Sequence, residues 1–216
     1  MHIMEGFLPV KWAIFWLIVF IPFLVLGLIR IRKLIAIDKN NKLLLALCAA
    51  FIFVLSALKI PSVTGSCSHP TGVGLATVMF GPLVVSVLGV IVLLFQALLL
   101  AHGGITTLGA NAMSMAVIGP MVGFVVYKLA RKLKCNKSVS IFLCAMTADL
   151  ATYLTTSVQL GVVFPDPASG MMASILKFMA IFCVTQVPIA IAEGLLTVVM
   201  YNLISKNLPE KVAQLR

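Results

Sequence analysis

Charged residues are scarce in this chain of 216 residues, at 10% of the total, and only six residues are acidic. Apolar residues make up 62% of the sequence, and the mean hydropathy is +1.16. A water-soluble domain of this length does not need so much apolar sequence, so the composition predicts an integral membrane protein. Five scattered cysteines form no paired framework, which argues against a disulfide-stapled secreted domain.

Two catalytic motifs are also missing from the sequence. There is no G-x-x-x-x-G-K-[ST] loop to cradle phosphates and no H-E-x-x-H pair to hold a catalytic zinc. We therefore expect no enzyme, and any ATP-driven function would need ATP-binding partner subunits. No basic segment precedes the first apolar run, so we expect either that translation starts at Met1 or that a leader has been removed before it.

Seven apolar stretches are candidates for membrane-spanning helices, each of which needs about 20 apolar residues. The third is the weakest prediction, because residues 73–101 are apolar throughout and only Gly81-Pro82 divides them into two helices. The predicted spans are Trp12–Arg30, Leu43–Lys59, Val73–Phe80, Pro82–Leu100, Ala112–Leu129, Val139–Val163 and Met172–Ile204.

The basic residues predict the orientation of these spans. Thirteen of the 16 lie in three clusters, at residues 30–42, 128–137 and 206–216. Such clusters mark cytoplasmic loops, so the net charge of +10 indicates a membrane protein rather than a nucleic-acid-binding one. The expected fold class is an all-α polytopic membrane protein of seven transmembrane helices, with its N-terminus outside and its C-terminus inside.

The three histidines of the chain, His2, His69 and His102, all fall on the external face in this topology. The α-amine of Met1, the amide nitrogen of His2 and its imidazole can close two fused chelate rings in one plane. Planar nitrogen ligation suits Cu(II) and Ni(II) and can also hold Co(II). His69 is the best candidate for the fourth nitrogen, and metal capture should weaken as pH falls because the amine must lose its proton.

Other polar residues have weaker claims on such a site. Cys67 is a possible soft ligand, although a free cysteine is more often a small buried residue. His102 and Asn111 are candidates to orient a ligating imidazole, or else they satisfy loop backbone. Asp149 and Glu193 lie within predicted spans, where carboxylates are candidate functional groups. We expect either a contact with a coupling protein, above all for Glu193, or hydrogen bonds between helices.

The sequence resembles the substrate-binding membrane component of cobalt and nickel energy-coupling-factor (ECF) transporters, the CbiM/NikM family. The resemblance covers essentially the whole chain and is closest to the cobalt branch, because nickel members tend to carry Asp where Glu5 stands. Some members carry a removable leader before the Met-His start. The segments that carry the resemblance are Met1–Pro9, Gly65–Gly74, Gln96–Asn111 and Ala148–Tyr153.

The resemblance implies an external metal-binding tail at residues 1–10, an extra N-terminal helix at 11–31 and a six-helix core at 43–204. It implies no cofactor, and Co(II) as the transported ion, in a square-planar site formed by the Met1 amine, the His2 amide and side chain, and His69. The implied partners are a transmembrane coupling protein, two ATP-binding subunits and a small accessory membrane subunit. The implied location is the cell membrane of a prokaryote, with uptake feeding cobalamin biosynthesis.

Three alternatives remain open from the sequence. A nickel importer would use the same ligands. A stand-alone metal channel or carrier would need weak binding and rapid release, which a multidentate chelate does not favour. An intramembrane metalloenzyme would need an open metal position, which a planar site with four nitrogens does not leave in its plane.

Overall fold

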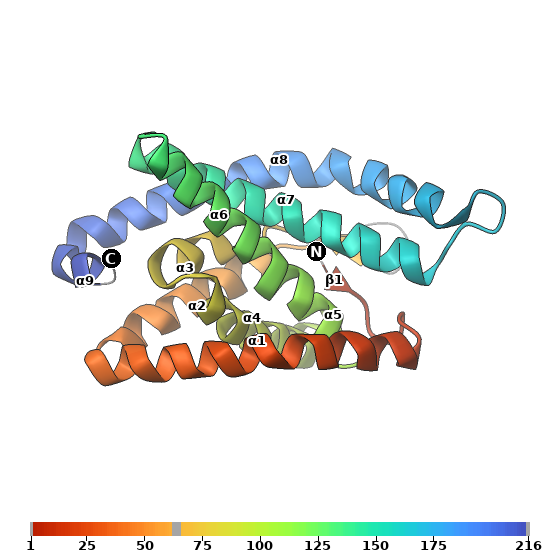
Figure 1. The fold of residues 1–216 in the computed structure, drawn as a ribbon, viewed down its shortest axis with the longest axis horizontal. Helices are drawn as coiled ribbons and strands as arrows, with labels where there is room; N and C mark the ends of the chain where they lie inside the picture. Colours follow the sequence, from red (N-terminus) through yellow and green to blue (C-terminus); the bar gives the residue numbers. More distant parts are fainter. Residues whose placement is uncertain (1, 62–65, 215–216) are drawn as a thin grey trace.

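The computed structural model describes residues 2–61 and 66–214, and over these residues the chain forms a helical bundle with one small sheet (Figure 1). The segment from α5 to α6 is continuous and includes a π-helical stretch, η1. The helices are α1 (Val10–Ile37), α2 (Asn41–Ala57), α3 (Val73–Phe80), α4 (Pro82–Leu100), α5 (Leu108–Ala112), η1 (Met113–Ile118), α6 (Gly119–Lys132), α7 (Lys137–Val163), α8 (Gly170–Asn207) and α9 (Pro209–Gln214).

The surface of the bundle is apolar, as a lipid environment requires. In α1 the buried residues recur every seven positions, at Phe20, Gly27 and Leu34, and most of the other apolar side chains are exposed. This narrow seam packs α1 against α4, since a Cβ on Gly27 would lie 2.3 Å from the carbonyl oxygen of Leu83. Among the described residues, five helical segments are long and apolar enough to cross a membrane. The predicted all-α membrane fold is confirmed at this level.

Each predicted span coincides with a helical segment, and the Gly81-Pro82 break is present. Gly81 has φ +87°, a conformation that favours glycine, and Pro82 begins α4. The eight residues of α3 extend only about 12 Å at 1.5 Å per residue, so this helix alone does not cross a bilayer. The helix α1 runs to Ile37, beyond the predicted end at Arg30.

A three-stranded sheet, which the sequence pattern did not predict, lies inside the bundle. Its antiparallel strands are β1 (His2–Ile3), β3 (Ser66–Ser68) and β2 (Ile60–Pro61), in the order β1-β3-β2. The register sets His2 opposite Cys67 and Ile3 opposite Ser66. The sheet therefore joins the start of the chain to the segment that leads into His69.

Glycines allow α6 to approach α7 closely. A Cβ on Gly119 would lie 2.3 Å from Oγ1 of Thr152, and one on Gly123 would lie 2.6 Å from the carbonyl oxygen of Cys144. Gly194 of α8 is equally close to the ring of Phe142 on α7. These three glycines therefore serve close packing between helices of this chain.

This packing predicts a measurable cost for one added methyl group. Gly123→Ala places its Cβ against backbone, which cannot move aside easily, so we expect a loss of about 1–3 kcal/mol of stability. The measurement is thermal unfolding of the purified chain in detergent. The control is Val125→Ile on the exposed face of α6, which should leave the melting temperature unchanged. Equal melting temperatures for the two variants would contradict the close approach of α6 and α7.

Candidate metal centre

The start of the chain is held in the bundle by side chains from the segment that follows α4. Oδ1 of Asn111 accepts a hydrogen bond from the backbone N–H of Ile3 at 2.8 Å. Nδ2 of Asn111 and the hydroxyl of Thr107 both donate to the carbonyl oxygen of Ile3, at 3.0 and 2.8 Å. These hydrogen bonds satisfy the backbone N–H and C=O of Ile3 on the edge of β1 that faces away from β3. Asn111 therefore fixes the backbone beside His2.

A second set of hydrogen bonds holds the tail further along the chain, at Glu5. The backbone N–H of Glu5 donates to the carbonyl oxygen of Gly103 at 3.1 Å, and the Thr106 hydroxyl donates to the Glu5 carboxylate at 2.5 Å. The hydrogen bond from the Thr106 hydroxyl lowers the pKa of Glu5 below its usual value. Together these bonds position residues 2–6 against the loop that carries His102.

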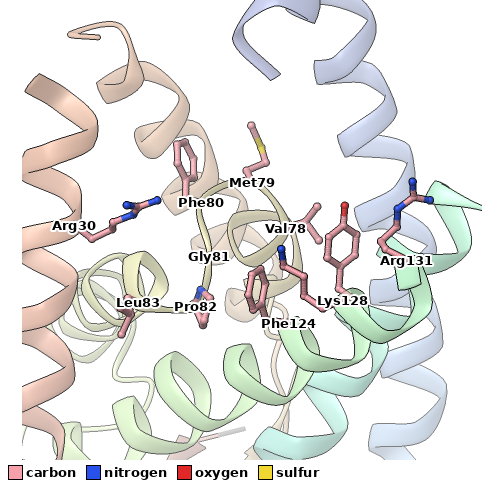
Figure 2. A pocket seen from close by; sticks show the side chains of 11 residues that line it. Arg30, Val78, Met79, Phe80, Gly81, Pro82, Leu83, Phe124, Lys128 and Arg131 are labelled. Carbon is pink, nitrogen blue, oxygen red and sulfur yellow. The ribbon is translucent and has the colours of Figure 1, made fainter. Parts of the chain in front are cut away.

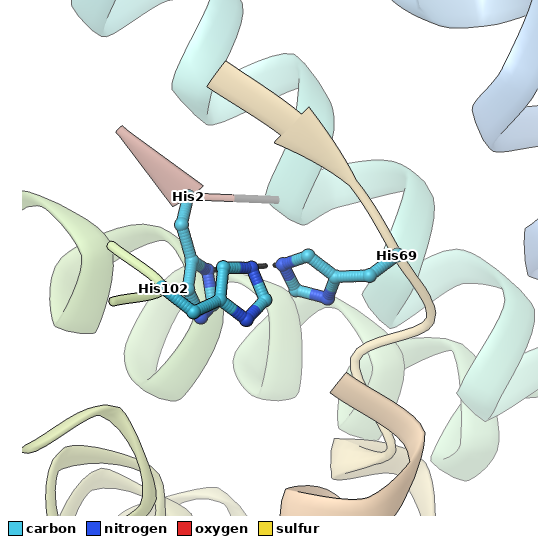
Figure 3. A group of neighbouring side chains, drawn as sticks. All are labelled: His2, His69 and His102. Atoms are coloured by element: carbon cyan, nitrogen blue, oxygen red, sulfur yellow. Dashed lines mark hydrogen bonds between the residues drawn. The ribbon is translucent and has the colours of Figure 1, made fainter. Parts of the chain in front are cut away.

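The three histidines come together at this point (Figure 3). They originate from the tail, from the loop after β3 and from the loop after α4, and each side chain is at most 2% exposed. One ring nitrogen from each lies within 4.8 Å of the others. The rings of His2 and His102 stack with centroids 4.4 Å apart, and the His69 ring meets that of His2 edge-on at 4.3 Å. The spacing of the three histidines in the sequence does not by itself predict this cluster, because successive histidines are 67 and 33 positions apart.

Hydrogen bonds fix which nitrogen of His69 carries its proton. Nδ1 of His69 lies 2.8 Å from the carbonyl oxygen of Pro70, which can only accept a hydrogen bond. The proton of the neutral ring is therefore on Nδ1, and Nε2 presents a lone pair. Nε2 points towards His2, with its nitrogen 3.0 Å from Nδ1 of that ring.

A chain of hydrogen bonds fixes the tautomer of His2 in the same way. The Ser56 hydroxyl donates to the carbonyl oxygen of Ile52, so it accepts from Nε2 of Gln96 at 2.6 Å. This orientation turns Oε1 of Gln96 towards His2, where it accepts from Nε2 of the imidazole at 2.9 Å. Nδ1 of His2 then presents its lone pair to Nε2 of His69. Neither facing nitrogen has a proton to donate to the other, which is the arrangement that a metal ion between them requires.

The spacing of this nitrogen pair also suits a metal ion. With metal–nitrogen bonds of about 2.0 Å, two ligands at right angles lie about 2.8 Å apart. The facing nitrogens of His2 and His69 are 3.0 Å apart, so little movement separates them from that geometry.

His102 and Cys67 form the wall beside this pair. Nε2 of His102 lies 2.9 Å from Sγ of Cys67, while Nδ1 of His102 has no hydrogen-bond partner within the described residues. Burial, together with the positive charge of Lys59, lowers the pKa of His102 to about 3, so the ring is neutral at physiological pH. Burial raises the pKa of the Cys67 thiol, so the thiol is neutral at physiological pH.

Both intramembrane carboxylates support the His69 loop within this chain, Glu193 by direct hydrogen bonds and Asp149 through Gln186. Glu193 of α8 accepts hydrogen bonds from the backbone N–H groups of Thr71 and Gly72, at 2.5 and 2.9 Å, and from the Thr71 hydroxyl at 2.8 Å. Asp149 of α7 accepts from Nε2 of Gln186 at 2.8 Å, and that amide also donates to the carbonyl oxygen of His69 at 3.0 Å. Both carboxylates are fully buried.

The observed contacts of Glu193 are hydrogen bonds to Thr71 and Gly72 of the His69 loop, and a contact with a coupling protein stays a prediction. Sequence reasoning missed Gln96 and Gln186 as supports of the site. The available signal was an amide inside an otherwise apolar helix, where a polar side chain needs a specific partner.

The structure brings together His2, His69, His102 and Cys67, with Asn111 on the backbone beside them. Met1, the other predicted ligand, lies outside the described residues. Of the segment Gly65–Gly74, the structure describes residues 66–74, which enter the bundle through β3 and α3.

Comparison with known proteins gives the family of this chain. The profile of CbiM, the cobalt uptake substrate-specific transmembrane region, matches residues 2–211. Proteins named cobalt transport protein CbiM include one from Listeria seeligeri that is 99% identical over 100% of this chain and 88% of its own length. One from Streptococcus sanguinis is 69% identical over 98% of this chain and 86% of its own length, and one from Salmonella typhimurium is 66% identical over 96% and 84%.

Solved structures agree with this assignment. A crystal structure described as a transition metal transporter is 29% identical, with a TM-score of 0.82, over 98% of this chain and 97% of the other. A truncated transition metal transporter, also 29% identical, has a TM-score of 0.80 over 97% and 99% of the two chains. The family resemblance inferred from the sequence is confirmed. The chain belongs to the CbiM family of cobalt-uptake transmembrane proteins, and it is a bacterial multi-pass membrane transport component.

Proposed function

We propose that this chain captures Co(II) at the outer face of the membrane and holds it between the imidazoles of His2 and His69. The observation that carries the proposal is the pair of facing ring nitrogens, Nδ1 of His2 and Nε2 of His69, which are 3.0 Å apart and both turned as acceptors. The remaining ligands of the proposed square plane are the amide nitrogen of His2 and the α-amine of Met1. All four are nitrogen donors that Co(II) and Ni(II) accept.

In this scheme His102 packs against the chelate without joining its plane. Its ring stacks on that of His2 with an angle of 28° between the two planes, which places it above the imidazole rather than beside it. Cys67 keeps His102 in place through its contact with Nε2. If the amine is not a ligand, His102 becomes the third nitrogen of a site formed by three histidines.

The burial of the site favours a binding component over a channel. All three histidines are at most 2% exposed, and the strand β1 covers them from one side. An ion in this position has exchanged its water shell for fixed nitrogens, and its release requires the tail to move. That property suits a protein that holds its cargo until partner proteins act, whereas conduction needs weak and rapidly exchanging sites.

We further propose seven membrane crossings, with residues 1–10 as the metal-binding tail, 11–31 as an extra helix and 43–204 as the six-helix core. The short α3 and the loop before it would together make the third crossing, because that loop is buried in protein, where non-helical backbone is tolerated. The basic clusters at residues 30–42, 128–137 and 206–216 would then face the cytoplasm.

The proposed partners are those of an ECF transporter. A transmembrane coupling protein and two ATP-binding subunits would supply the energy, because this chain has no phosphate-binding loop of its own. A small accessory membrane subunit completes the proposed complex, and the imported cobalt would feed cobalamin biosynthesis.

One extra residue before Met1 tests the chelate, since it leaves every side chain in place and moves the amine. We expect Co(II) affinity, measured by calorimetry, to fall by more than the roughly 10- to 100-fold that losing an orienting partner costs. Binding in this scheme releases two protons, one from the amine and one from the His2 amide, so in the native form affinity should rise roughly a hundredfold per pH unit below the amine pKa of about 8. Equal affinity of the two forms would contradict the amine as a ligand and favour the site of three histidines. The same calorimetric measurement with Ni(II) shows which of the two metals the site prefers.

Gln96→Leu tests the tautomer of His2. Without the acceptor Oε1, nothing fixes the proton on Nε2, so we expect Co(II) affinity to fall about 10- to 100-fold. The matched control is Gln159→Leu, a buried amide that donates to the carbonyl oxygen of Ala110 and touches none of the histidines. The same loss of affinity in both variants would show that the effect is general to the bundle and not specific to His2.

Glu193→Gln tests the support of the His69 loop. A glutamine has one acceptor oxygen and turns an NH₂ group towards the N–H donors of Thr71 and Gly72, so the loop should shift. We expect Co(II) affinity to fall about tenfold or more, with Glu210→Gln on the surface of α9 as the control. Unchanged affinity in Glu193→Gln would remove this carboxylate from the account of the site.

A further inference from the structure

A cavity of about 600 Å³ lies where α3 ends and α4 begins (Figure 2). It is at the opposite end of α4 from Gln96 and the metal centre. Pro82, in its wall, is about 21 Å along α4 from Gln96, at 1.5 Å per residue. The volume is within the range of about 300–1,000 Å³ that is typical of ligand sites. None of the interactions described for metal capture uses this cavity.

Three cations line this cavity, which we call the basic pocket. Arg30 comes from α1, and Lys128 and Arg131 come from α6, and Figure 2 shows Arg30 and Lys128 directed into the space between these helices. Among the described residues that line it, none is acidic. Three like charges around one cavity repel one another, so an anion in their midst relieves the repulsion.

Two of the cations are held in place by neighbouring groups. Nη1 of Arg131 donates to the carbonyl oxygen of Cys135 at 2.8 Å, which leaves its other N–H donors for a ligand. Nζ of Lys128 lies 5.3 Å from the centroid of the Phe124 ring. This partial ordering reduces the entropy that would be lost when an anion binds.

The N-terminus of α4 opens onto the same cavity. Gly81, Pro82 and Leu83 line it, and no side chain within the described residues caps this end of the helix. The first backbone N–H groups of a helix are left without partners inside it, and they carry about half a positive charge, which suits a phosphate group. The carbonyl end of α3 at the same turn contributes about the opposite half charge, and three full cations outweigh it.

We propose that the basic pocket binds the phosphate group of an anionic phospholipid. Apolar side chains of Val78, Phe80 and Phe124 share the wall with the cations, as a headgroup with its glycerol and acyl chains requires. The apolar outer face of α1 places this wall beside lipid. Basic pockets between transmembrane helices on the cytoplasmic side are suited to such headgroups. A bound lipid would tie α1 to α6, and this role is independent of the metal chemistry.

The experiment measures binding of dioctanoylphosphatidylglycerol to the full purified chain in a neutral detergent, with dioctanoylphosphatidylcholine as the zwitterionic comparison. The variant R30Q/K128Q/R131Q should bind the anionic lipid on the order of a hundredfold more weakly, since each cation near the headgroup contributes about a factor of five. The control R32Q/K33Q/K132Q removes the same charge from the same clusters outside the cavity and should bind as the native chain does. The conservative variant R30K/R131K keeps all three charges and should retain most of the binding.

Free inorganic phosphate shares the chemistry of the headgroup, so millimolar phosphate is added as a competitor. Lipid binding that depends on the three cations and resists phosphate supports the proposal. Displacement by phosphate assigns the pocket to the free anion and overturns the lipid assignment. The lipid assignment is also overturned if the two triple variants bind equally weakly, or if the affinity for phosphatidylglycerol does not exceed that for phosphatidylcholine. Either result would leave an acidic segment of a partner protein as the occupant to test. Size-exclusion chromatography of each variant shows that the fold is kept.

Discussion

Two imidazole nitrogens turned towards each other, with both protons fixed on the far side of their rings, are the constraint on which the site depends. The carbonyl oxygen of Pro70 holds the proton of His69 on Nδ1, and Gln96 holds the proton of His2 on Nε2. Two acceptors at 3.0 Å attract a cation and do not attract each other. The direction of each surrounding hydrogen bond serves this arrangement. The Ser56 hydroxyl, for example, accepts from the Gln96 amide and so turns the amide oxygen towards His2.

The rest of the fold brings these two rings together from distant parts of the chain. The tail is held as a strand by β3 and by the side chains of Asn111 and Thr107, and the His69 loop rests on Glu193 and on the Asp149–Gln186 pair. Carboxylates are costly inside a membrane unless they are fully hydrogen-bonded. Their burial beneath a loop is therefore informative, because backbone N–H groups, a hydroxyl and an amide satisfy them and so hold the loop that carries His69.

Much of the architecture could be predicted from the sequence. Apolar runs placed the long helices, and Gly81-Pro82 placed the break between α3 and α4, because φ at Gly81 is positive and Pro82 starts a helix readily. The three histidines were expected on one face. The sheet β1-β3-β2 could not be predicted, because strands of two or three residues carry no periodic pattern. The roles of Gln96 and Glu193 depend on contacts over 94 and 122 positions, which a single sequence does not reveal.

The most direct measurement is the anomalous diffraction of cobalt in crystals of the chain grown with Co(II). The account predicts a single strong peak between Nδ1 of His2 and Nε2 of His69, at about 2.0 Å from each, with all further ligands in the same plane. A peak bound to His102 and the Cys67 sulfur, or one that lies away from the facing nitrogen pair, would contradict the assignment of these two nitrogens as the centre of the site.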